Sequence, residues 1–332
     1  MEMKKFPKIR QFADIIRHVK SRADFQGLDA DEQPIYRHEA DYPTLNFTGT
    51  VKLHGTNAAV VWGENGDYHI QSRSRIITVA DDNAGFAAFL AGLGTDIYAL
   101  KMENCAVYGE WCGGNIQKGV AITGLPKMFV IFGAKTVGED GAWQYLNFSR
   151  EEIRGLNENN IFLISQFPVY KISIDFERPE IAQQTIIDMV EVVENECPVG
   201  RYFDSIGIGE GIVWTCDQDP TSELWFKTKG EKHSSSKVKK VAAVDIEKVN
   251  SVREFVAQTC TENRMNQGLD VLRERGIELS MKSTGDYLRW VVTDILDEEA
   301  TLLGESGLCA KDVGGAISEK ARPFWFKIVR GI

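Results

Sequence analysis

The 332-residue sequence has few cysteines, no long apolar run and no excess of positive charge. Its six cysteines form no CxxC pair and do not cluster with histidine, which argues against a zinc site and for buried or free thiols. No apolar run approaches the roughly 20 residues of a membrane helix. The N-terminal MEMKKFPKIRQF also lacks the apolar region of a secretory signal. We therefore expect a cytoplasmic monomer with no membrane partner.

The formal net charge of −10 argues against a nucleic-acid partner, because such proteins use cationic patches to displace counterions. A local patch matters more than the total charge, however. Lysines gather between positions 227 and 240, at Lys227, Lys229, Lys232, Lys237, Lys239 and Lys240. The acidic balance therefore weakens the case for a nucleic-acid partner without removing it.

Hydrophobic periodicity divides the first 230 residues between strands and helices. Runs of β-branched and aromatic residues predict strands within 45–75 and at 106–111, 128–135, 211–214 and 224–229. The Asn-Gly of GENGD predicts a hairpin between AAVVW and YHIQSR. Helical spacing predicts helices at 8–20, 82–92 and 179–195. This mixture indicates an α+β domain built on antiparallel sheets.

The composition changes at 231–243, where EKHSSSKVKKVAA combines three serines with lysines and predicts an exposed linker. Beyond it, 245–330 has an almost wholly helical pattern. We expect one domain at 1–240 and a helical C-terminal domain at 245–332.

The chemistry centres on VKLHGTNAAVV at 51–61, where Lys52 ends a predicted strand. A free lysine has a pKa of about 10.4 and is not a nucleophile near neutral pH. Among other cations and partly desolvated, Lys52 would lose its proton more easily and could attack phosphorus. Gly55 removes a side chain where the turn must admit a nucleotide, and Asn57 could bind a ribose or position the lysine. A Lys-x-x-Gly pattern alone is a weak signal.

The order of the motifs that follow adds weight to this pattern. They are RSR at 73–75, YGEWCGG with Glu110, MFVIFGA with Phe132, GEGIVW with Glu210, and LWFKTK with Lys227 and Lys229. The two lysines of the last motif are two residues apart, so both should face one side of a strand. Together these motifs supply a nucleophile, cations for a triphosphate, two carboxylates for Mg²⁺ or ribose, and an aromatic ring. Taken singly, Glu110 and Glu210 are typical of solvated strand ends, and Phe132 is typical of an apolar core.

The ordered set KLHGTN, SR, YGE, FVIF, EGIVW and FKTK resembles the motifs of the covalent nucleotidyltransferase superfamily of ligases and RNA capping enzymes. Within it, the chain resembles the phage RNA ligase 2 family, relatives of the kinetoplastid RNA-editing ligases. The resemblance covers residues 52–229. It implies an α+β nucleotidyltransferase (ATP-grasp-like ligase) domain of antiparallel sheets with flanking helices, plus a small all-helical C-terminal domain that assists RNA sealing.

The resemblance also implies a role for each motif residue. Lys52 would be the adenylylated nucleophile, and Asn57 would bind the ribose or position the lysine. Arg73 would contact phosphate, with Arg75 as the alternative, Glu110 would bind a ribose hydroxyl, and Phe132 would stack on adenine. Glu210 would serve the metal and the lysine environment, and Lys227 and Lys229 would bind phosphate and promote adenylyl transfer. Two positions depart from related patterns. DNA ligases and capping enzymes usually carry Asp where this chain has His54, which favours RNA. Gly133 stands where many members have an acidic residue.

The implied reaction joins RNA 3′-hydroxyl and 5′-phosphate ends, using ATP and Mg²⁺, through lysyl-AMP and RNA-adenylate. The implied substrate is a nick in duplex RNA. An RNA capping guanylyltransferase and a DNA ligase share the lysine chemistry, but the helical tail does not resemble the OB-fold expected in them. A non-catalytic RNA-binding protein is the remaining alternative, and the presence of every charged motif residue argues against it.

Overall fold

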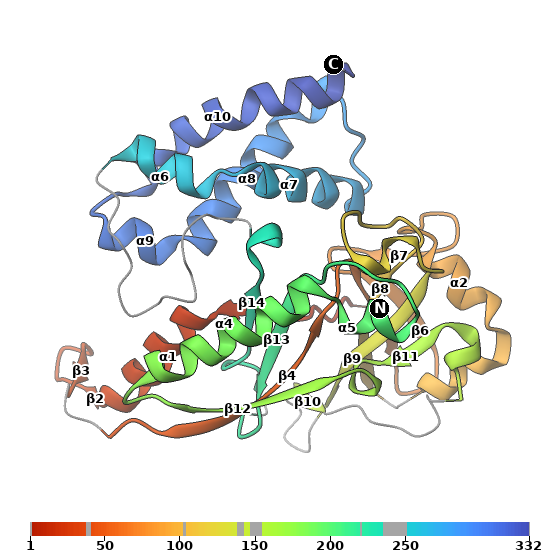
Figure 1. Ribbon diagram of the computed structural model, residues 1–332, viewed down its shortest axis with the longest axis horizontal. Coiled ribbons are helices and arrows are strands. Elements are labelled where there is room, and N and C mark those ends of the chain that lie inside the picture. The colour runs from red at the N-terminus through yellow and green to blue at the C-terminus, as the bar shows by residue number, and fades with distance from the viewer. Residues whose placement is uncertain are drawn as a thin grey trace. The chain divides into compact units, whose positions relative to one another are not determined.

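The computed structural model describes residues 2–37, 41–101, 104–137, 143–146, 155–219, 221–234 and 251–331. The chain divides into two compact units, Met1–Gly230 and Glu231–Ile332. Figure 1 shows sheets with flanking helices in the first unit and helices in the second. The boundary expected at 240–245 lies outside the described residues, as do Lys237, Lys239 and Lys240 of the expected linker. In the part of the chain described, no helix is long and apolar enough to cross a membrane.

The first sheet of unit 1 brings the lysine motif and the last two motifs together. Its strands, in spatial order, are β1 (Arg10–Gln11), β14 (Phe226–Lys229), β13 (Gly211–Cys216), β4 (Thr44–Lys52) and β12 (Val169–Asp175). Neighbours are antiparallel except for the parallel pair β1 and β14. Gly211 lies opposite Lys52 on one side and Lys229 on the other. The ends of β4 and β14 therefore meet at the start of β13.

Helices cover one face of this sheet. Helices α1 (Phe12–Asp24) and α4 (Pro179–Asn195) lie along its strands (Figure 1), and the short α5 (Pro198–Tyr202) follows α4. The Phe12 and Phe226 rings lie 5.0 Å apart, and α4 buries a stripe of apolar side chains at helical spacing. Strand alternation places Phe226 and Thr228 on the buried face and Lys227 and Lys229 on the opposite one.

The second sheet carries the other motifs. Its strands, in spatial order, are β10 (Trp143–Leu146), β9 (Met128–Val137), β8 (Cys105–Cys112), β5 (Thr56–Trp62), β6 (Tyr68–Ser72) and β7 (Ile76–Ile77), with β11 (Ile161–Leu163) paired in parallel to β9. The predicted hairpin at GENGD is confirmed, because β5 and β6 pair antiparallel with Trp62 opposite Tyr68. Gly66 in its turn has φ of 75°, which glycine adopts at little cost.

This sheet also has one face that a helix covers and one face that this helix leaves uncovered. Helix α2 (Phe86–Gly92) packs with Ala58, Val60 and Trp62 into a large apolar core. The opposite face carries a smaller cluster of Ala59, Val61, Ala106 and Tyr108. By strand alternation Asn57 and Glu110 belong to this second face. In both sheets, therefore, the polar motif residues lie on the face that these helices leave uncovered.

The remaining elements of unit 1 are short. A separate ribbon pairs β2 (Phe25–Leu28) with β3 (Pro34–Tyr36). Short 3₁₀ helices span Gly94–Leu100, Ala121–Gly124, Asn157–Asn159 and Ile164–Gln166. The expected α+β class and antiparallel sheets are confirmed. The first helix begins at Phe12 rather than at residue 8, because Arg10 and Gln11 pair with β14.

Unit 2 is helical across its described residues, and its helices surround one apolar core. The α-helices are α6 (Val252–Thr259), α7 (Glu262–Glu274), α8 (Thr284–Glu298), α9 (Ala300–Glu305) and α10 (Ala310–Arg330), and 3₁₀ helices span Glu231–His233 and Met281–Ser283. Arg264 is fully buried and forms ion pairs with Asp294 at 2.7 Å and Glu299 at 2.5 Å. These pairs tie α7 to α8 and to the junction before α9.

We predict that Arg264→Met destabilises the protein by about 3–5 kcal/mol, because it leaves the buried Glu299 carboxylate without this cation. The measurement is urea unfolding followed by tryptophan fluorescence. Arg273→Met is the matched control, because its ion pair with Asp270 is exposed and should contribute less than about 1 kcal/mol. Equal losses in the two variants would contradict a structural role for the buried pairs.

Candidate active site

Lys52 ends β4, and the His54-Gly55 turn leads directly into β5. The Gly55 N–H donates a hydrogen bond to Glu110 Oε1 at 2.9 Å. A Cβ atom on Gly55 would lie 2.4 Å from the Trp111 carbonyl oxygen and 2.7 Å from Cys112 Cβ. The expectation that Gly55 makes room for a nucleotide is therefore wrong. The missing side chain instead lets the turn approach β8 closely.

Glu210 is the centre of the site. Its side chain is 2% exposed, yet it meets three groups that can carry positive charge. Glu210 Oε2 lies 2.7 Å from Lys52 Nζ and 3.4 Å from His54 Nδ1, and Oε1 lies 2.8 Å from Lys229 Nζ. The neighbouring Gly211 has φ of 149°, and a Cβ there would lie 2.1 Å from the Thr228 carbonyl oxygen. Glycine at this position therefore allows β14 to bring Lys229 up to Glu210.

The charges of this cluster stabilise one another. Burial opposes the ionised form of Glu210, but Lys229, Lys52 and His54 hold the pKa of its carboxyl well below the usual value. Burial also opposes the charge on Lys52, but Glu210 and Glu110 more than offset it and raise the pKa of the amine. The positive charge of Arg73 acts in the opposite direction. The expectation that neighbouring cations would lower the pKa of Lys52 is therefore wrong for the nucleotide-free site, because the carboxylates prevail.

Glu110 is a second carboxyl of the site with a very different environment. It lies on β8 opposite Asn57 of β5. Burial raises the pKa of Glu110 to about 7, although Lys52 and His54 act to lower it. The Glu210 carboxyl is therefore ionised under all ordinary conditions, while the Glu110 carboxyl changes charge near neutral pH.

Phe132 owes its position to a β-bulge in β9. Tyr108 pairs with Gly133 and Gly109 with Ile131, so Phe132 is the extra residue between them. Its ring packs with the cluster around Tyr108, on the same face of the sheet as Glu110. A Cβ on Gly133 would meet no atom within 4 Å, so this position adds open space rather than a carboxylate.

The N-terminal segment also reaches this face. The Phe6 ring lies 5.0 Å from Phe132 and 5.1 Å from Tyr108, centre to centre. The Lys4 carbonyl accepts a hydrogen bond from the Tyr108 hydroxyl at 2.7 Å, and the Lys4 N–H donates to Gln71 at 3.0 Å. Residues from the start of the chain therefore line the face that holds Phe132.

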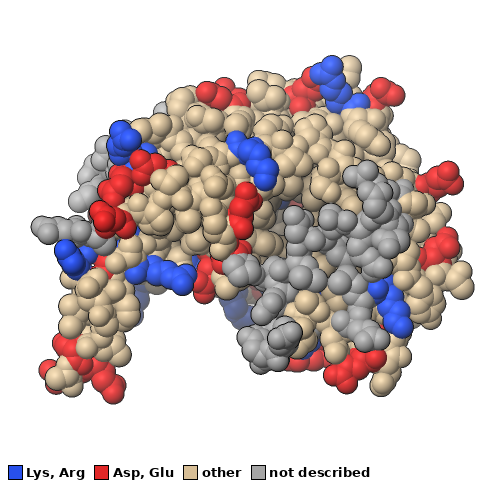
Figure 2. Space-filling model, turned by 90° about the horizontal axis from the view of Figure 1, so that it is seen from below, with Lys and Arg blue, Asp and Glu red and all other residues tan. Residues whose placement is uncertain are grey.

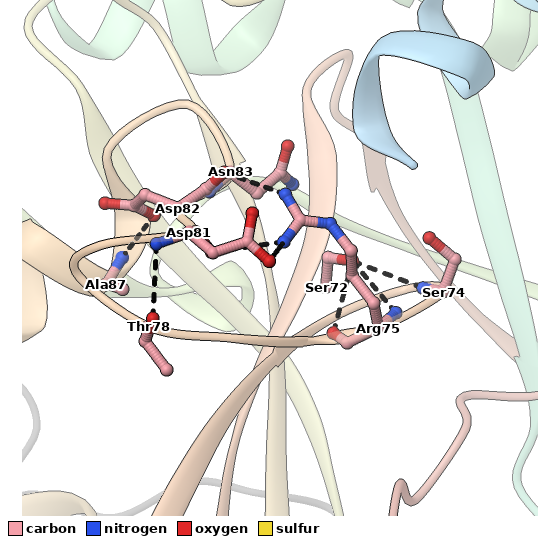
Figure 3. Close-up of polar contacts among 8 residues, drawn as sticks. All are labelled: Ser72, Ser74, Arg75, Thr78, Asp81, Asp82, Asn83 and Ala87. Atoms are coloured by element: carbon pink, nitrogen blue, oxygen red, sulfur yellow. Dashed lines mark hydrogen bonds and ion pairs between the residues drawn. The ribbon is translucent and has the colours of Figure 1, made fainter. Parts of the chain in front are cut away.

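The structure distinguishes the two arginines of RSR. Arg75 is bound to the loop that follows it, with hydrogen bonds to the carbonyls of Asp81 at 3.1 Å and Asp82 at 2.8 Å (Figure 3). Arg73 lies at an exposed position of the preceding turn, and its charge acts on Lys52. Arg73 is accordingly the better placed of the two for a phosphate near Lys52.

The structure brings several of the predicted residues together and places the others on the same faces of the two sheets. Lys52, Lys229 and Glu210 are in direct contact, and Glu110 and Arg73 act on Lys52 electrostatically. Lys227 shares the face of β14 with Lys229, while Asn57 and Phe132 lie on the uncovered face of the second sheet.

Sequence reasoning gave no role to His54 and Phe6, although both belong to the site. His54 was visible inside the KLHG motif, but its contact with a residue 156 positions away was not. Phe6 stands in a polar N-terminal segment and carries no motif signal.

Comparison with known families agrees with this geometry. The profile of the family described as RNA ligase matches residues 45–229, more than half of the chain. The chain belongs to the RNA ligase family. The matched range begins in β4, ends with Lys229 and includes every motif residue named above. A comparison with curated proteins finds no match.

Among solved structures, this RNA ligase family member is similar to an RNA ligase from Naegleria gruberi. A lysine-to-alanine variant of that ligase with ATP and Mn has 15% identity and a TM-score of 0.43, with 69% of this chain and 57% of that chain covered. The same ligase with PPi has 14% identity and a TM-score of 0.44, with coverage of 69% and 56%. The chain thus spans a little over half the length of these ligases.

Charges of both signs are mixed on one face of the described part of this RNA ligase family member (Figure 2). Figure 2 shows one face on which the Lys and Arg side chains of the described residues are scattered among Asp and Glu. Positive charge is concentrated instead around Glu210, inside the site.

We predict that Glu110→Gln stabilises the protein above neutral pH. Because the folded pKa of Glu110 is about 7 rather than 4.5, the native state retains a proton that the unfolded state has lost. Stability contributed by this proton is present below pH 4.5 and is lost as the pH rises through 7. The variant avoids this loss, so its advantage over wild type should grow by up to about 3 kcal/mol across that window. Urea unfolding at pH 4.5 and pH 8 measures it, and a difference independent of pH would contradict the prediction.

Proposed function

We propose that this chain is an ATP-dependent RNA ligase that joins 3′-hydroxyl and 5′-phosphate ends through lysyl-AMP and RNA-adenylate. The observation that carries the proposal is the Lys52 amine, held 2.7 Å from the buried Glu210 carboxylate, with Lys229 on the other carboxylate oxygen. The Lys52 side chain is 22% exposed, and its ion pair with Glu210 fixes the position of its amine.

In the first step the Lys52 nitrogen attacks the α-phosphorus of ATP. A nitrogen–phosphorus bond forms, the bond to the bridging oxygen breaks, and pyrophosphate leaves. The attacking amine must first lose a proton, which Glu210 and Glu110 oppose and Arg73 favours. Activation therefore requires that the field of these carboxylates be weakened when the nucleotide binds.

Mg²⁺ fits this site as an ion bound mainly by phosphates. Among the described residues, no three His, Cys, Asp or Glu side chains gather as they would around an ion held by protein alone. Both Glu210 oxygens already contact lysines, so direct ligation would compete with these ion pairs. Mg²⁺ commonly uses one or two carboxylates, water and substrate phosphates. Glu210 is the carboxylate of the site that would interact with such an ion. When bound, the ion supplies charge neutralisation at the phosphates and at Glu210.

The other residues bind the nucleotide. Lys227, Lys229 and Arg73 are the cations available to the phosphates. Glu110 and Asn57, paired across β8 and β5, accept and donate hydrogen bonds at the ribose. The adenine then stacks on Phe132, whose ring the β-bulge turns to this face.

In the second step an oxygen of the RNA 5′-phosphate attacks the α-phosphorus and Lys52 leaves. In the third step the 3′-hydroxyl attacks the activated 5′-phosphate and AMP leaves. We propose nicked duplex RNA as the substrate, read through phosphates and 2′-hydroxyls without sequence specificity. The KLHGTN motif supports a kinship with the phage RNA ligase 2 family, and in this scheme residues 245–332 would assist sealing.

We predict that the protein incubated with α-labelled ATP and Mg²⁺ acquires a covalent, acid-labile label on Lys52. Lys52→Ala should abolish the label, because it removes the proposed nucleophile. Lys171→Ala is the control, since Lys171 lies on the exposed β12 and pairs with Asp217, and it should label normally. Peptide mapping identifies the labelled residue. A wild-type protein that binds nicked RNA but never labels would favour the non-catalytic alternative.

We further predict that Lys229→Ala lowers the adenylylation rate by about 100-fold or more while the protein stays folded. The change removes a cation from the phosphate site and leaves Glu210 to interact more strongly with Lys52. Single-turnover labelling at saturating ATP measures the rate, and circular dichroism checks the fold. A substantial loss of ellipticity would mean that Lys229 has a packing role instead.

A further inference from the structure

Arg75, the last residue of RSR, binds the far end of the segment that follows it (Figure 3). Arg75 Nη1 donates to the Asp81 carbonyl at 3.1 Å, and Nη2 donates to the Asp82 carbonyl at 2.8 Å. Nη1 also lies 2.7 Å from Asp81 Oδ2. One guanidinium group therefore binds two successive peptide carbonyls and a carboxylate, and it joins the beginning of residues 75–82 to their end.

The far end of this segment is attached to the active-site turn. The Asp82 carboxylate accepts hydrogen bonds from the N–H groups of Ala87 at 2.8 Å and Ala88 at 3.0 Å, in the first turn of α2. The buried Asn83 side chain donates to Thr56 Oγ1 at 3.1 Å. Thr56 is the first residue of β5 and directly follows Gly55. The segment closed by Arg75 is thus fixed to the strand that leads out of the KLHG motif.

The near end of the segment holds Arg73. The Ser72 hydroxyl oxygen accepts hydrogen bonds from the N–H groups of Ser74 and Arg75, both at 3.3 Å. The Ser72 N–H donates to the Arg75 carbonyl at 2.8 Å. Arg73 and Ser74 therefore stand in a short turn whose two ends, Ser72 and Arg75, are bonded to each other. Whatever fixes Arg75 also fixes the backbone of Arg73.

We propose that Arg75 is a positioning residue that holds the turn bearing Arg73 at the phosphate site. This inference rests on the proposed function, because it concerns the binding of ATP phosphates by Arg73. Arg75 makes no phosphate contact of its own in this scheme, since its guanidinium group is engaged by residues 81 and 82. Small displacements of a binding group can lower rates by as much as about 100-fold, so a held backbone matters for function.

The geometry requires arginine rather than lysine at position 75. A planar guanidinium group can donate to two carbonyls and a carboxylate at once, whereas an ammonium group on a flexible stem fixes one position less well. Arg75→Lys keeps the positive charge but not the planar group. It should therefore recover only part of the function that Arg75→Met loses.

The test is a double-mutant cycle of Arg75→Met and Arg73→Ala, read as the KM for ATP in lysine adenylylation. Arg75→Met should raise KM about tenfold with a smaller effect on kcat, and Arg73→Ala should raise it at least as much. Because Arg75 acts through Arg73, the double variant should be no worse than Arg73→Ala alone. Multiplied effects in the double variant would overturn the inference.

A second readout separates this inference from the proposed function. The same cycle is repeated in the Lys52→Ala background, with the Kd for ATP measured by equilibrium dialysis, so that no turnover is needed. A wild-type protein that fails to label overturns the proposed function, whereas unchanged Kd values in the Arg75→Met variant overturn the role of Arg75.

Two controls exclude a general loss of structure. Arg201→Met removes an exposed arginine that pairs with Glu196 at 3.0 Å, and it should leave KM unchanged. Asp81→Asn keeps both carbonyl contacts of Arg75 and weakens only the ion pair, so it should raise KM less than Arg75→Met. If Arg75→Met does not fold, Asp81→Asn carries the cycle with Arg73→Ala, and an additive result there overturns the inference equally.

Discussion

The ion pairs of Glu210 are the interaction on which the site depends. A buried carboxylate is costly unless it is paired, and here two lysines at 2.7 and 2.8 Å from its oxygens compensate the burial. The pairs join β4 to β13 and β14, which follow it in the sheet order but lie far from it in sequence. One carboxylate therefore sets the position of the proposed nucleophile and of the proposed phosphate-binding Lys229 at the same time.

The fold explains why this carboxylate can be both buried and near a nucleotide. Each of the two large sheets of unit 1 packs helices on one face, where Phe226 and Trp62 belong to the apolar core. Strand alternation then directs Lys227, Lys229 and Glu110 to the opposite faces without any special backbone geometry. Special geometry occurs at three points of the site, the close approach at Gly55, the positive φ of Gly211 and the bulge at Phe132.

The sequence was sufficient for what depends on local periodicity and motif order. The period of two in FKTK predicted that Lys227 and Lys229 share a face, and GENGD predicted the β5–β6 hairpin; the structure agrees with both. Features set by distant residues could not be predicted in this way. The pKa of Lys52 depends on Glu210, 158 positions away, and the surroundings of Phe132 depend on Phe6. No local pattern encodes either contact.

The local charge reconciles an acidic chain with the phosphate binding that we propose for its site. At the proposed nucleophile, the cationic side chains of Lys52, Lys229 and Arg73 oppose the two carboxylates of Glu210 and Glu110. Glu110 is only partly ionised near pH 7, because burial raises its pKa to about that value. The site is therefore positive even though the whole chain carries −10. Burial strengthens this local field relative to charges on the solvated surface, where salt screens them. Phosphate binding at this site thus depends on a small, paired and buried cluster rather than on the net charge of the protein.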